Sequence, residues 1–367
     1  MKILITGANG FIAKNLISHL RETKNIELLL LYKESTITEL ATFIDQCDFI
    51  FHLAGVNRPK ETEEFNQVNF GLTNQICKLV AKSTKKIPII FSSSTQVLLD
   101  NEYGESKLSA EKSLETLANE ENVPVAVFRL PNVFGKWGKP NYNSVVATFC
   151  FNIVNGKPIQ INNPKTELTL TYIDDLIFEF ITTMNSRFTG YGYFKVSSFT
   201  TNLEELSSLI YRFKESRSSL ITENVGQGFS RALYATYLSY LKPQDFSYKV
   251  PAYKDDRGQF SEILKTKESG QFSFFTAHSG VTRGGHYHHT KNEKFLVVKG
   301  KARFNFKQID TGETFTIETD NTQVEIVETI PGWAHDITNI GDSEMVVLLW
   351  ANEIFDKEKP DTYSHSL

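Results

Sequence analysis

The sequence begins Met1-Lys2-Ile3-Leu4-Ile5-Thr6-Gly7-Ala8-Asn9-Gly10-Phe11-Ile12-Ala13, and this stretch decides the fold of the first half of the chain. A short apolar run ends in a glycine turn, and an amphipathic segment follows over residues 10–22. A strand, a glycine turn and a helix in that order predict the first unit of a parallel sheet with helical crossovers. The N–H groups of the turn and the positive end of the helix can bind a pyrophosphate.

The same alternation continues along the first half of the chain. Apolar runs at residues 2–5, 27–32, 49–53, 87–92 and 125–130 predict strands, and residues 103–120 predict a second helix. This pattern predicts a doubly wound parallel sheet of the Rossmann type. From about Arg257 the runs become short and alternating, at residues 294–298, 301–306, 324–327 and 345–350. Such runs, separated by glycine, predict an antiparallel all-β domain.

The length of 367 residues predicts two domains, because domains usually contain about 100 to 200 residues. The boundary is expected near Asp245, where a segment with proline and polar residues follows a helical, aromatic-rich stretch at residues 233–241. The predicted domains are therefore residues 1–245 and residues 246–367. Six of the eight histidines follow the boundary, which indicates that the two domains carry different chemistry.

Charge and cysteine content exclude several classes of protein. The 39 basic and 43 acidic residues give a formal net charge of −4, which argues against a nucleic-acid partner. The three cysteines lie far apart without CxxC spacing, which excludes a disulfide scaffold and a thiolate zinc ribbon. No apolar stretch approaches the roughly 18 to 20 residues of a membrane span, and no export signal is visible. We therefore expect a cytoplasmic protein without a membrane partner.

Tyr103 and Lys107 lie four residues apart, on one face of the predicted helix. The spacing alone is weak evidence, because it occurs three times in the chain. The other pairs are Tyr191/Lys195 and Tyr287/Lys291. Only the first pair closely follows a strand that ends in a run of hydroxyl residues, at the edge where such sheets bind ligands. We expect Tyr103 to exchange a proton with a substrate oxygen, Lys107 to favour the phenolate, and Ser94 (or Thr95) to hold that oxygen.

The second predicted strand is followed by Lys33 and Glu34. In NAD-preferring folds, an acidic residue near this position binds the ribose of the adenosine. Lys33 would instead bind a 2'-phosphate, although a solvated surface lysine fits the position equally well. The sequence therefore favours NADPH over NADH as the cofactor.

These motifs together resemble the extended short-chain dehydrogenases/reductases over about 245 residues. The supporting segments are TGANGFIA (residues 6–13), HLAG (52–55), a Val-Asn pair that ends at Asn69, the Ser/Tyr/Lys set, RLPNVFG (129–135) and YIDD (172–175). The resemblance implies a set of cofactor-binding residues: Gly7, Asn9, Gly10, Phe11, Ile12, Lys33, Leu53, Ala54, Gly55, Asn69, Tyr103 and Lys107. Two departures are Ala13 in place of a third glycine and the short gap between Ser94 and Tyr103.

The second half contains histidines at regular spacing. Its pattern is Gly280-x5-His286-x-His288-x4-Glu293-x6-Gly300, followed by Gly332-x2-His335-x3-Asn339. This pattern resembles the two metal motifs of the cupin family. His286 and His288 on one strand would point to the same face, with Glu293 on the adjoining strand and His335 on a later one. Three nitrogens and one oxygen are a donor set that suits zinc.

A metal-free alternative remains open for the same domain. DDRGQF (residues 255–260) and RGGH (283–286) also resemble cupins that epimerise 4-keto-6-deoxy sugar nucleotides without a metal. In those enzymes a histidine is the base, so His286 or His288 would transfer protons.

The fusion of a reductase with a cupin resembles the CapF (WbjC) family of capsular-polysaccharide enzymes over essentially the whole chain. HYHHTKNEKFLVV (residues 286–298) and WANEIFDKEKPDTY (350–363) add to this resemblance. It implies a homodimeric, bifunctional enzyme that acts on UDP-2-acetamido-2,6-dideoxy-4-keto-hexose. The cupin would epimerise C3, and the reductase would reduce C4 to give UDP-2-acetamido-2,6-dideoxy-L-talose, on the path to UDP-N-acetyl-L-fucosamine for capsule or O-antigen.

Two alternatives to this function remain open. One is a sugar-nucleotide dehydratase or C4 epimerase that recycles its own NAD. The other is a non-enzymatic protein that senses NADPH and binds a sugar.

Overall fold

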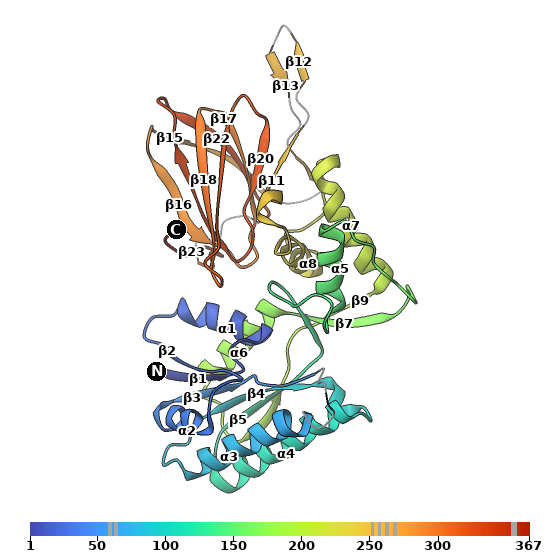
Figure 1. The fold of residues 1–367 in the computed structure, drawn as a ribbon, viewed down its shortest axis with the longest axis vertical. Helices are drawn as coiled ribbons and strands as arrows, with labels where there is room; N and C mark the ends of the chain where they lie inside the picture. Colours follow the sequence, from blue (N-terminus) through green and yellow to red (C-terminus); the bar gives the residue numbers. More distant parts are fainter. Residues whose placement is uncertain are drawn as a thin grey trace. The chain divides into compact units, whose positions relative to one another are not determined.

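The computed structural model describes residues 1–57, 61, 65–250, 253–255, 258–260, 264–266, 270–353 and 358–367 (Figure 1). The chain divides into two compact units. The first comprises Met1–Phe134, Asn141–Ser144 and Leu168–Thr200, and the second comprises Gly135–Pro140, Val145–Glu167 and Thr201–Leu367. Within the described residues, no helix is both long enough and apolar enough to cross a membrane.

A six-stranded parallel sheet forms the centre of the first unit, in the order β2-β1-β3-β4-β5-β8. Its strands are β1 (Lys2–Thr6), β2 (Glu27–Leu31), β3 (Phe49–His52), β4 (Ile89–Ser94), β5 (Val125–Leu130) and β8 (Tyr191–Phe194). The strand order reverses at β1, because β2 lies on one side of it and β3 on the other. Ligands of such sheets bind beyond the carboxyl ends of the strands at this switch point. The predicted Rossmann-like parallel sheet is confirmed.

Helices cover both faces of this sheet (Figure 1). One face carries α1 (Phe11–Arg21) and α6 (Ile173–Asn185), and the other carries α2 (Ile37–Gln46), α3 (Leu72–Lys82) and α4 (Glu102–Glu121). Ile50 and Phe91 pack into the core beneath α2, α3 and α4. Phe51 and Phe128 point to the opposite face, where their rings contact Phe180 of α6 at centroid distances of 5.8 and 4.9 Å. Alternate residues of each strand therefore fill two separate cores.

A small three-stranded sheet was not predicted from the sequence. Its order is β6-β7-β9, and its strands are β6 (Asn132–Phe134), β7 (Glu167–Tyr172) and β9 (Phe199–Asn202).

The second unit combines helices with antiparallel sheets. The helices are α5 (Val145–Val154), α7 (Leu203–Ser219) and α8 (Gly228–Leu238). Phe213 of α7 contacts Tyr234 and Tyr237 of α8, at ring-centroid distances of 4.9 and 5.9 Å. Arg217 of α7 forms an ion pair with Glu328 in the β-rich part of the same unit. The expected boundary at Asp245 lies inside this compact unit, and a domain boundary there stays a prediction.

Two five-stranded antiparallel sheets form the β-rich part of the second unit, in the orders β11-β20-β17-β22-β15 and β19-β18-β21-β16-β23. The strands are β11 (Ser247–Lys249), β15 (Gln271–Ala277), β16 (Thr282–Tyr287), β17 (Glu293–Lys299), β18 (Lys301–Gln308), β19 (Thr314–Asp320), β20 (Glu325–Glu328), β21 (Trp333–Asn339), β22 (Met345–Ala351) and β23 (Tyr363–Ser364). Phe295 of the first sheet contacts Phe304 of the second at a ring-centroid distance of 5.6 Å, so the sheets face each other. The predicted antiparallel all-β part is confirmed, and a closed cupin barrel stays a prediction.

Two short strand pairs complete the described structure. They are β12 (Tyr253–Asp255) with β13 (Gly258–Phe260), and β10 (Ile221–Thr222) with β14 (Lys265–Thr266). Asp256 and Arg257 of the DDRGQF motif, and residues 354–357 of the C-terminal motif, lie outside the described residues.

Candidate active site and metal centre

The predicted pyrophosphate turn lies at the carboxyl end of β1, directly before α1. Gly7 has a φ of +69°, and a Cβ atom on it would lie 2.7 Å from the Cα atom of Ala54. Both the backbone conformation and the loop after β3 therefore exclude a side chain at Gly7. The other predicted residues of this segment occupy the turn and the first turn of α1: Asn9, Gly10, Phe11 and Ile12. The free N–H groups of α1 thus lie at the switch point.

Thr6, the last residue of β1, is a site residue that the sequence prediction missed. Its hydroxyl accepts hydrogen bonds from the N–H groups of Leu53 and Ala54, each at 3.1 Å, and contacts His52 Nδ1 at 2.8 Å. Burial and, to a smaller extent, the nearby positive charge of Lys107 lower the pKa of His52 to about 3, so this imidazole is neutral. Thr6 therefore ties the predicted cofactor loop to β1 through neutral hydrogen bonds.

Asn69 fixes the same loop from the other side. It lies in a π-helical segment, η1 (Phe65–Gly71), and is buried. Its side chain accepts from the Val56 N–H at 2.8 Å and donates to the Val56 carbonyl at 3.0 Å and to Ser106 Oγ at 3.0 Å. A Cβ atom on Gly55 would lie 3.1 Å from Lys107 Nζ, so this position has little room for a side chain. The loop after β3 is thus joined to α4.

Ser94, Tyr103 and Lys107 meet where β4 ends and α4 begins. Ser94 is the last residue of β4, and the other two lie in the first two turns of α4. Lys107 is buried, and its Nζ donates to the carbonyl of Ser92 at 2.9 Å and lies 4.8 Å from the ring centroid of Phe91. The lysine charge is therefore held in a fixed place on the helix face that also carries Tyr103.

Burial sets the protonation of Tyr103 in the protein alone. Burial raises the pKa of Tyr103, and a hydrogen bond with Ser94 only partly opposes the increase. Burial also lowers the pKa of Lys107 to about 8, against the opposing effect of Glu111. Burial therefore raises the pKa of Tyr103 by more than the hydrogen bond with Ser94 lowers it. The residue is therefore a phenol that can donate a proton.

Thr95, the alternative to Ser94, is directed differently. Its side chain is exposed, and its hydroxyl donates to the carbonyl of Leu130 at 3.5 Å. Ser94 is buried and forms a hydrogen bond with Tyr103. This geometry favours Ser94 as the hydroxyl beside the phenol.

Glu111, one helical turn after Lys107, was also missed by the sequence prediction. It is buried, and its carboxylate pairs with Arg129 at 2.6 Å and accepts from Ser93 Oγ at 2.5 Å. A glutamate four residues after a lysine is common on exposed helices, so the spacing gave no signal.

Lys33 lies in the turn directly after β2 and is exposed. Because β2 is the parallel neighbour of β1, this turn and the Gly7 turn lie at the same edge of the sheet. The position is compatible with the predicted contact to a 2'-phosphate.

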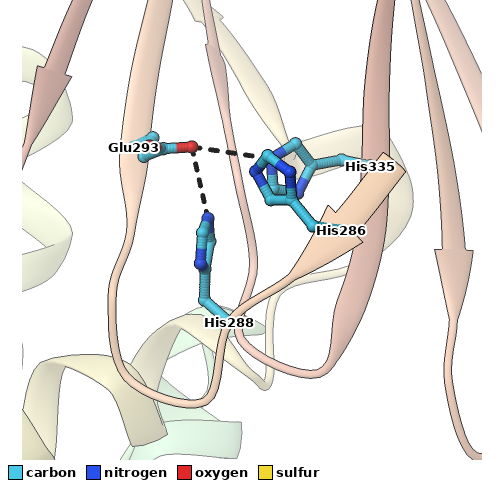
Figure 2. Close-up of side chains that lie close together, drawn as sticks. All are labelled: His286, His288, Glu293 and His335. Carbon is cyan, nitrogen blue, oxygen red and sulfur yellow. Dashed lines mark hydrogen bonds and ion pairs between the residues drawn. The ribbon is translucent and has the colours of Figure 1, made fainter. Parts of the chain in front are cut away.

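Four predicted residues of the β-rich part lie close together (Figure 2). His286 lies on β16, His288 directly follows that strand, Glu293 begins β17, and His335 lies on β21. One ligand atom from each residue lies within 4.8 Å of the others. Glu293 Oε2 is 3.3 Å from His288 Nε2 and 3.5 Å from His335 Nε2. His286 is partly exposed, and the other three residues are buried.

The expected position of Glu293 on a strand adjoining that of His286 was wrong. β16 pairs with β21 and β23, whereas β17 belongs to the other sheet, so Glu293 approaches the histidines from the facing sheet. His286 and His335 are direct neighbours across the β16–β21 pair. The register shifts between Gly284 and His286, so Gly285, with a φ of +77°, is the extra residue of a bulge before His286. Gly284 has a φ of +102°, and a Cβ atom on it would lie 3.0 Å from the His335 carbonyl oxygen. His288 reaches the site from the loop that follows β16.

The protonation states of this cluster fit a divalent cation. Burial and the neighbouring histidines lower the pKa of His286 to about 4, and burial lowers the pKa of His335. Burial alone would raise the pKa of Glu293, but contacts with His288 and His335 hold it well below its usual value. The cluster therefore offers imidazole lone pairs and one carboxylate, a donor set typical of zinc sites.

Lys291 is a further residue of this cluster that the sequence prediction missed. It is buried, and its Nζ lies 2.8 Å from Glu293 Oε1. Glu293 Oε2 is the oxygen that faces His288 and His335. The carboxylate thus directs one oxygen to the lysine and the other to the histidines.

Comparisons with known proteins cover both parts of the chain. Residues 3–192 match the NAD dependent epimerase/dehydratase family, and residues 253–363 match the polysaccharide biosynthesis C-terminal domain. A UDP-2-acetamido-2,6-beta-L-arabino-hexul-4-ose reductase from Pseudomonas aeruginosa is 54% identical over 368 residues, which cover 100% of this chain and 99% of the relative. The crystal structure of the capsular polysaccharide assembling protein CapF from Staphylococcus aureus is 41% identical, covers 100% of both chains and has a TM-score of 0.69. The chain belongs to the CapF family.

The full-length CapF match distinguishes this chain from other proteins with a similar first unit. A UDP-glucuronic acid 4-epimerase from Bacillus cereus is 18% identical, with a TM-score of 0.53, and covers 58% of this chain and 83% of its own. That likeness shows the fold alone. The CapF match extends to the β-rich part and therefore includes the segments that carry the histidine cluster.

Proposed function

We propose that this member of the CapF family is a bifunctional enzyme that acts on UDP-2-acetamido-2,6-dideoxy-4-keto-hexose. Its β-rich part, as a cupin domain, epimerises C3, and its Rossmann-like part then reduces the C4 ketone with NADPH. The product is UDP-2-acetamido-2,6-dideoxy-L-talose, on the path to UDP-N-acetyl-L-fucosamine for capsule or O-antigen. One observation carries the proposal: a chain with a full-length hexul-4-ose reductase relative contains two separate clusters of reactive side chains.

The first cluster supports ketone reduction. Ser94 would hold the C4 oxygen, and Tyr103 would donate its phenolic proton to the same oxygen. When bound, NADPH would supply the hydride that reaches C4. Lys107 would stabilise the phenolate that remains, because its charge is held beside Tyr103 by the bond to the Ser92 carbonyl at 2.9 Å.

The second cluster supports epimerisation next to that ketone. A C4 carbonyl acidifies the C3 proton, so epimerisation must precede the reduction that removes the carbonyl. His286, His288, Glu293 and His335 would hold a zinc ion. When bound, zinc would polarise the C4 oxygen. In the metal-free alternative, His286 or His288 would itself accept the C3 proton.

Analysis of bound metal separates these two forms of the second site. We expect about one zinc per chain in the purified protein, which is the stoichiometry of a single mononuclear site. His335→Ala should lower the zinc content, whereas His278→Ala, outside the cluster, should not. Loss of epimerisation in His288→Ala with zinc retained would support the histidine-base alternative.

The net reaction tests the proposed function as a whole. The purified chain is incubated with the UDP-4-keto sugar and NADPH, the NADPH absorbance is followed, and NMR gives the product configuration at C3 and C4. We expect one NADPH oxidised for each sugar reduced, with inverted C3. Turnover without net NADPH consumption would indicate a dehydratase or C4 epimerase with recycled NAD. Binding without turnover would indicate an NADPH-sensing protein.

The oligomeric state, the location and the partners of the enzyme are also proposed. A homodimer and a cytoplasmic location are proposed from the family resemblance. The printed name of the full-length relative supports a UDP-sugar substrate. The formal net charge of −4 argues against a nucleic-acid partner.

A further inference from the structure

The C-terminal tail lies against the strand that carries the first histidine of the cluster. β23 pairs antiparallel with β16, and Ser364 lies opposite His286 in this pair. Asp361, two residues before β23, lies next to the loop that connects β16 to β17. This loop begins at His288 and is followed directly by Glu293 at the start of β17, so two of the four proposed metal ligands lie at its two ends.

The carboxylate of Asp361 accepts four hydrogen bonds from this loop. Its Oδ1 accepts from the His289 N–H at 2.9 Å. Its Oδ2 accepts from the Thr290 N–H at 2.7 Å, the Thr290 hydroxyl at 2.9 Å and the Lys291 N–H at 2.6 Å. Because the acceptor is ionised, such bonds are short and strong. They fix the backbone of three consecutive loop residues.

The backbone of Asp361 also orients a metal ligand. Its carbonyl oxygen accepts from His288 Nδ1 at 2.5 Å. A proton on Nδ1 leaves the lone pair of His288 on Nε2, the atom that lies 3.3 Å from Glu293 Oε2. Carbonyl groups that accept from the second ring nitrogen of a ligating histidine fix its tautomer and orientation.

The side-chain bonds of Asp361 extend to the second ligand of the loop. They hold the backbone of Lys291, and the ammonium group of Lys291 lies 2.8 Å from Glu293 Oε1. This ion pair leaves Glu293 Oε2 facing the histidines. Asp361 therefore supports His288 directly and Glu293 through Lys291, without being a ligand itself.

We propose that Asp361 is a positioning residue for the metal centre. From the C-terminal tail, it sets the ring of His288 and holds the loop that brings Lys291 to Glu293. This inference rests on the proposed metal site and adds to it a residue about 70 positions away in the sequence. Removal of such outer partners typically weakens metal binding by about 10- to 100-fold.

Cobalt binding to the metal-free, full-length chain tests the proposal. Co²⁺ is titrated against a competing chelator, and its visible absorption bands report the coordination geometry. We expect Asp361→Asn to weaken Co²⁺ binding by about 10- to 100-fold and to alter the bands. Asp342→Asn is the matched control, because Asp342 is exposed in the turn before β22, and it should change neither.

Thermal unfolding in the presence of the chelator shows whether the Asp361→Asn variant folds. If it does not fold, a second variant tests the proposal. Thr290→Val removes the hydroxyl bond to Asp361 and also the bond that this hydroxyl accepts from Arg231, but it keeps the three backbone bonds to Asp361. We therefore expect Co²⁺ binding about 2- to 10-fold weaker, a smaller effect than that of Asp361→Asn. The role of Asp361 would be overturned if a folded Asp361→Asn variant bound Co²⁺ with unchanged affinity and unchanged absorption bands. If only Thr290→Val folds, the same result in that variant would overturn it. Absence of Co²⁺ binding in the unmodified chain would instead overturn the proposed metal site.

Discussion

The two candidate sites are built in opposite ways. In the Rossmann-like part, the polar side chains are bonded to the protein itself, as Lys107 is to the Ser92 carbonyl and Asn69 to the Val56 backbone. In the β-rich part, three imidazoles and a carboxylate converge from two facing sheets, with one ligand atom of each within 4.8 Å of the others. The first arrangement keeps a proton donor in place beside a fixed charge, whereas the second concentrates lone pairs where a cation would bind. The two sites therefore offer different chemistry, and single substitutions should separate their reactions.

The largest expected effect is that of Tyr103→Phe on ketone reduction. Loss of the proton donor should lower kcat for NADPH oxidation by about 10²- to 10⁴-fold, the usual contribution of general acid catalysis. Tyr211→Phe is the control, because Tyr211 is exposed on α7. If Tyr103→Phe reduces the ketone at the rate of the unmodified chain, the proposed proton donor is wrong.

A smaller effect is expected at the edge of the same site, where Lys33→Glu should weaken the preference for NADPH. One charge-assisted hydrogen bond contributes about 1.5 to 3 kcal/mol, so kcat/KM for NADPH relative to NADH should fall by about 10- to 150-fold. Lys24→Glu, in the exposed segment before β2, controls for the change of net charge. Equal use of both cofactors by the unmodified chain would contradict the role of Lys33.

The smallest expected effect is on the pH dependence of reduction. Burial lowers the pKa of Lys107 to about 8, and the Glu111 carboxylate opposes this shift. Since loss of the lysine proton removes the positive charge beside Tyr103, kcat/KM should fall as the pH rises through about 8. Glu111→Gln removes the opposing charge, so the pKa of Lys107 should fall further and the decrease should begin at lower pH. Glu115→Gln, exposed one turn later on α4, should leave the profile unchanged.

A shift of this decrease to higher pH in Glu111→Gln would contradict the sign of the electrostatic effect. No shift would show that the titrating group is not Lys107. Either result would leave the ketone reduction itself in place and change only the assignment of the charge partner.

The parallel sheet could be predicted because strands buried on both faces are continuous apolar runs. The predicted strand at residues 125–130 coincides with β5 (Val125–Leu130), and the strand predicted at residues 27–32 exceeds β2 by one residue. The four residues of the histidine cluster could also be named from the sequence, because the spacing within each of the two histidine motifs identifies them. The strand pairing of Glu293 was not found, because alternation shows which face a residue occupies but not which strand lies beside it.

Residues that act through distant partners left no signal in the sequence. Thr6 contacts a loop 47 residues away, and Asp361 contacts Lys291 at a separation of 70 residues. Neither contact has a local spacing rule, because each depends on how strands far apart in the sequence are arranged. Glu111 was missed for a different reason, since the same helical spacing is common on solvated surfaces.

Deuterium exchange at C3 tests most directly the central claim that the chain contains two independent reactive sites. The UDP-4-keto sugar is incubated in deuterium oxide without NADPH, and NMR follows the loss of the C3 proton signal. We expect the unmodified chain and Tyr103→Phe to exchange this proton at similar rates, and His335→Ala to lose the exchange. Exchange abolished by Tyr103→Phe but retained by His335→Ala would contradict the claim, because a single site in the Rossmann-like part would then carry out both reactions.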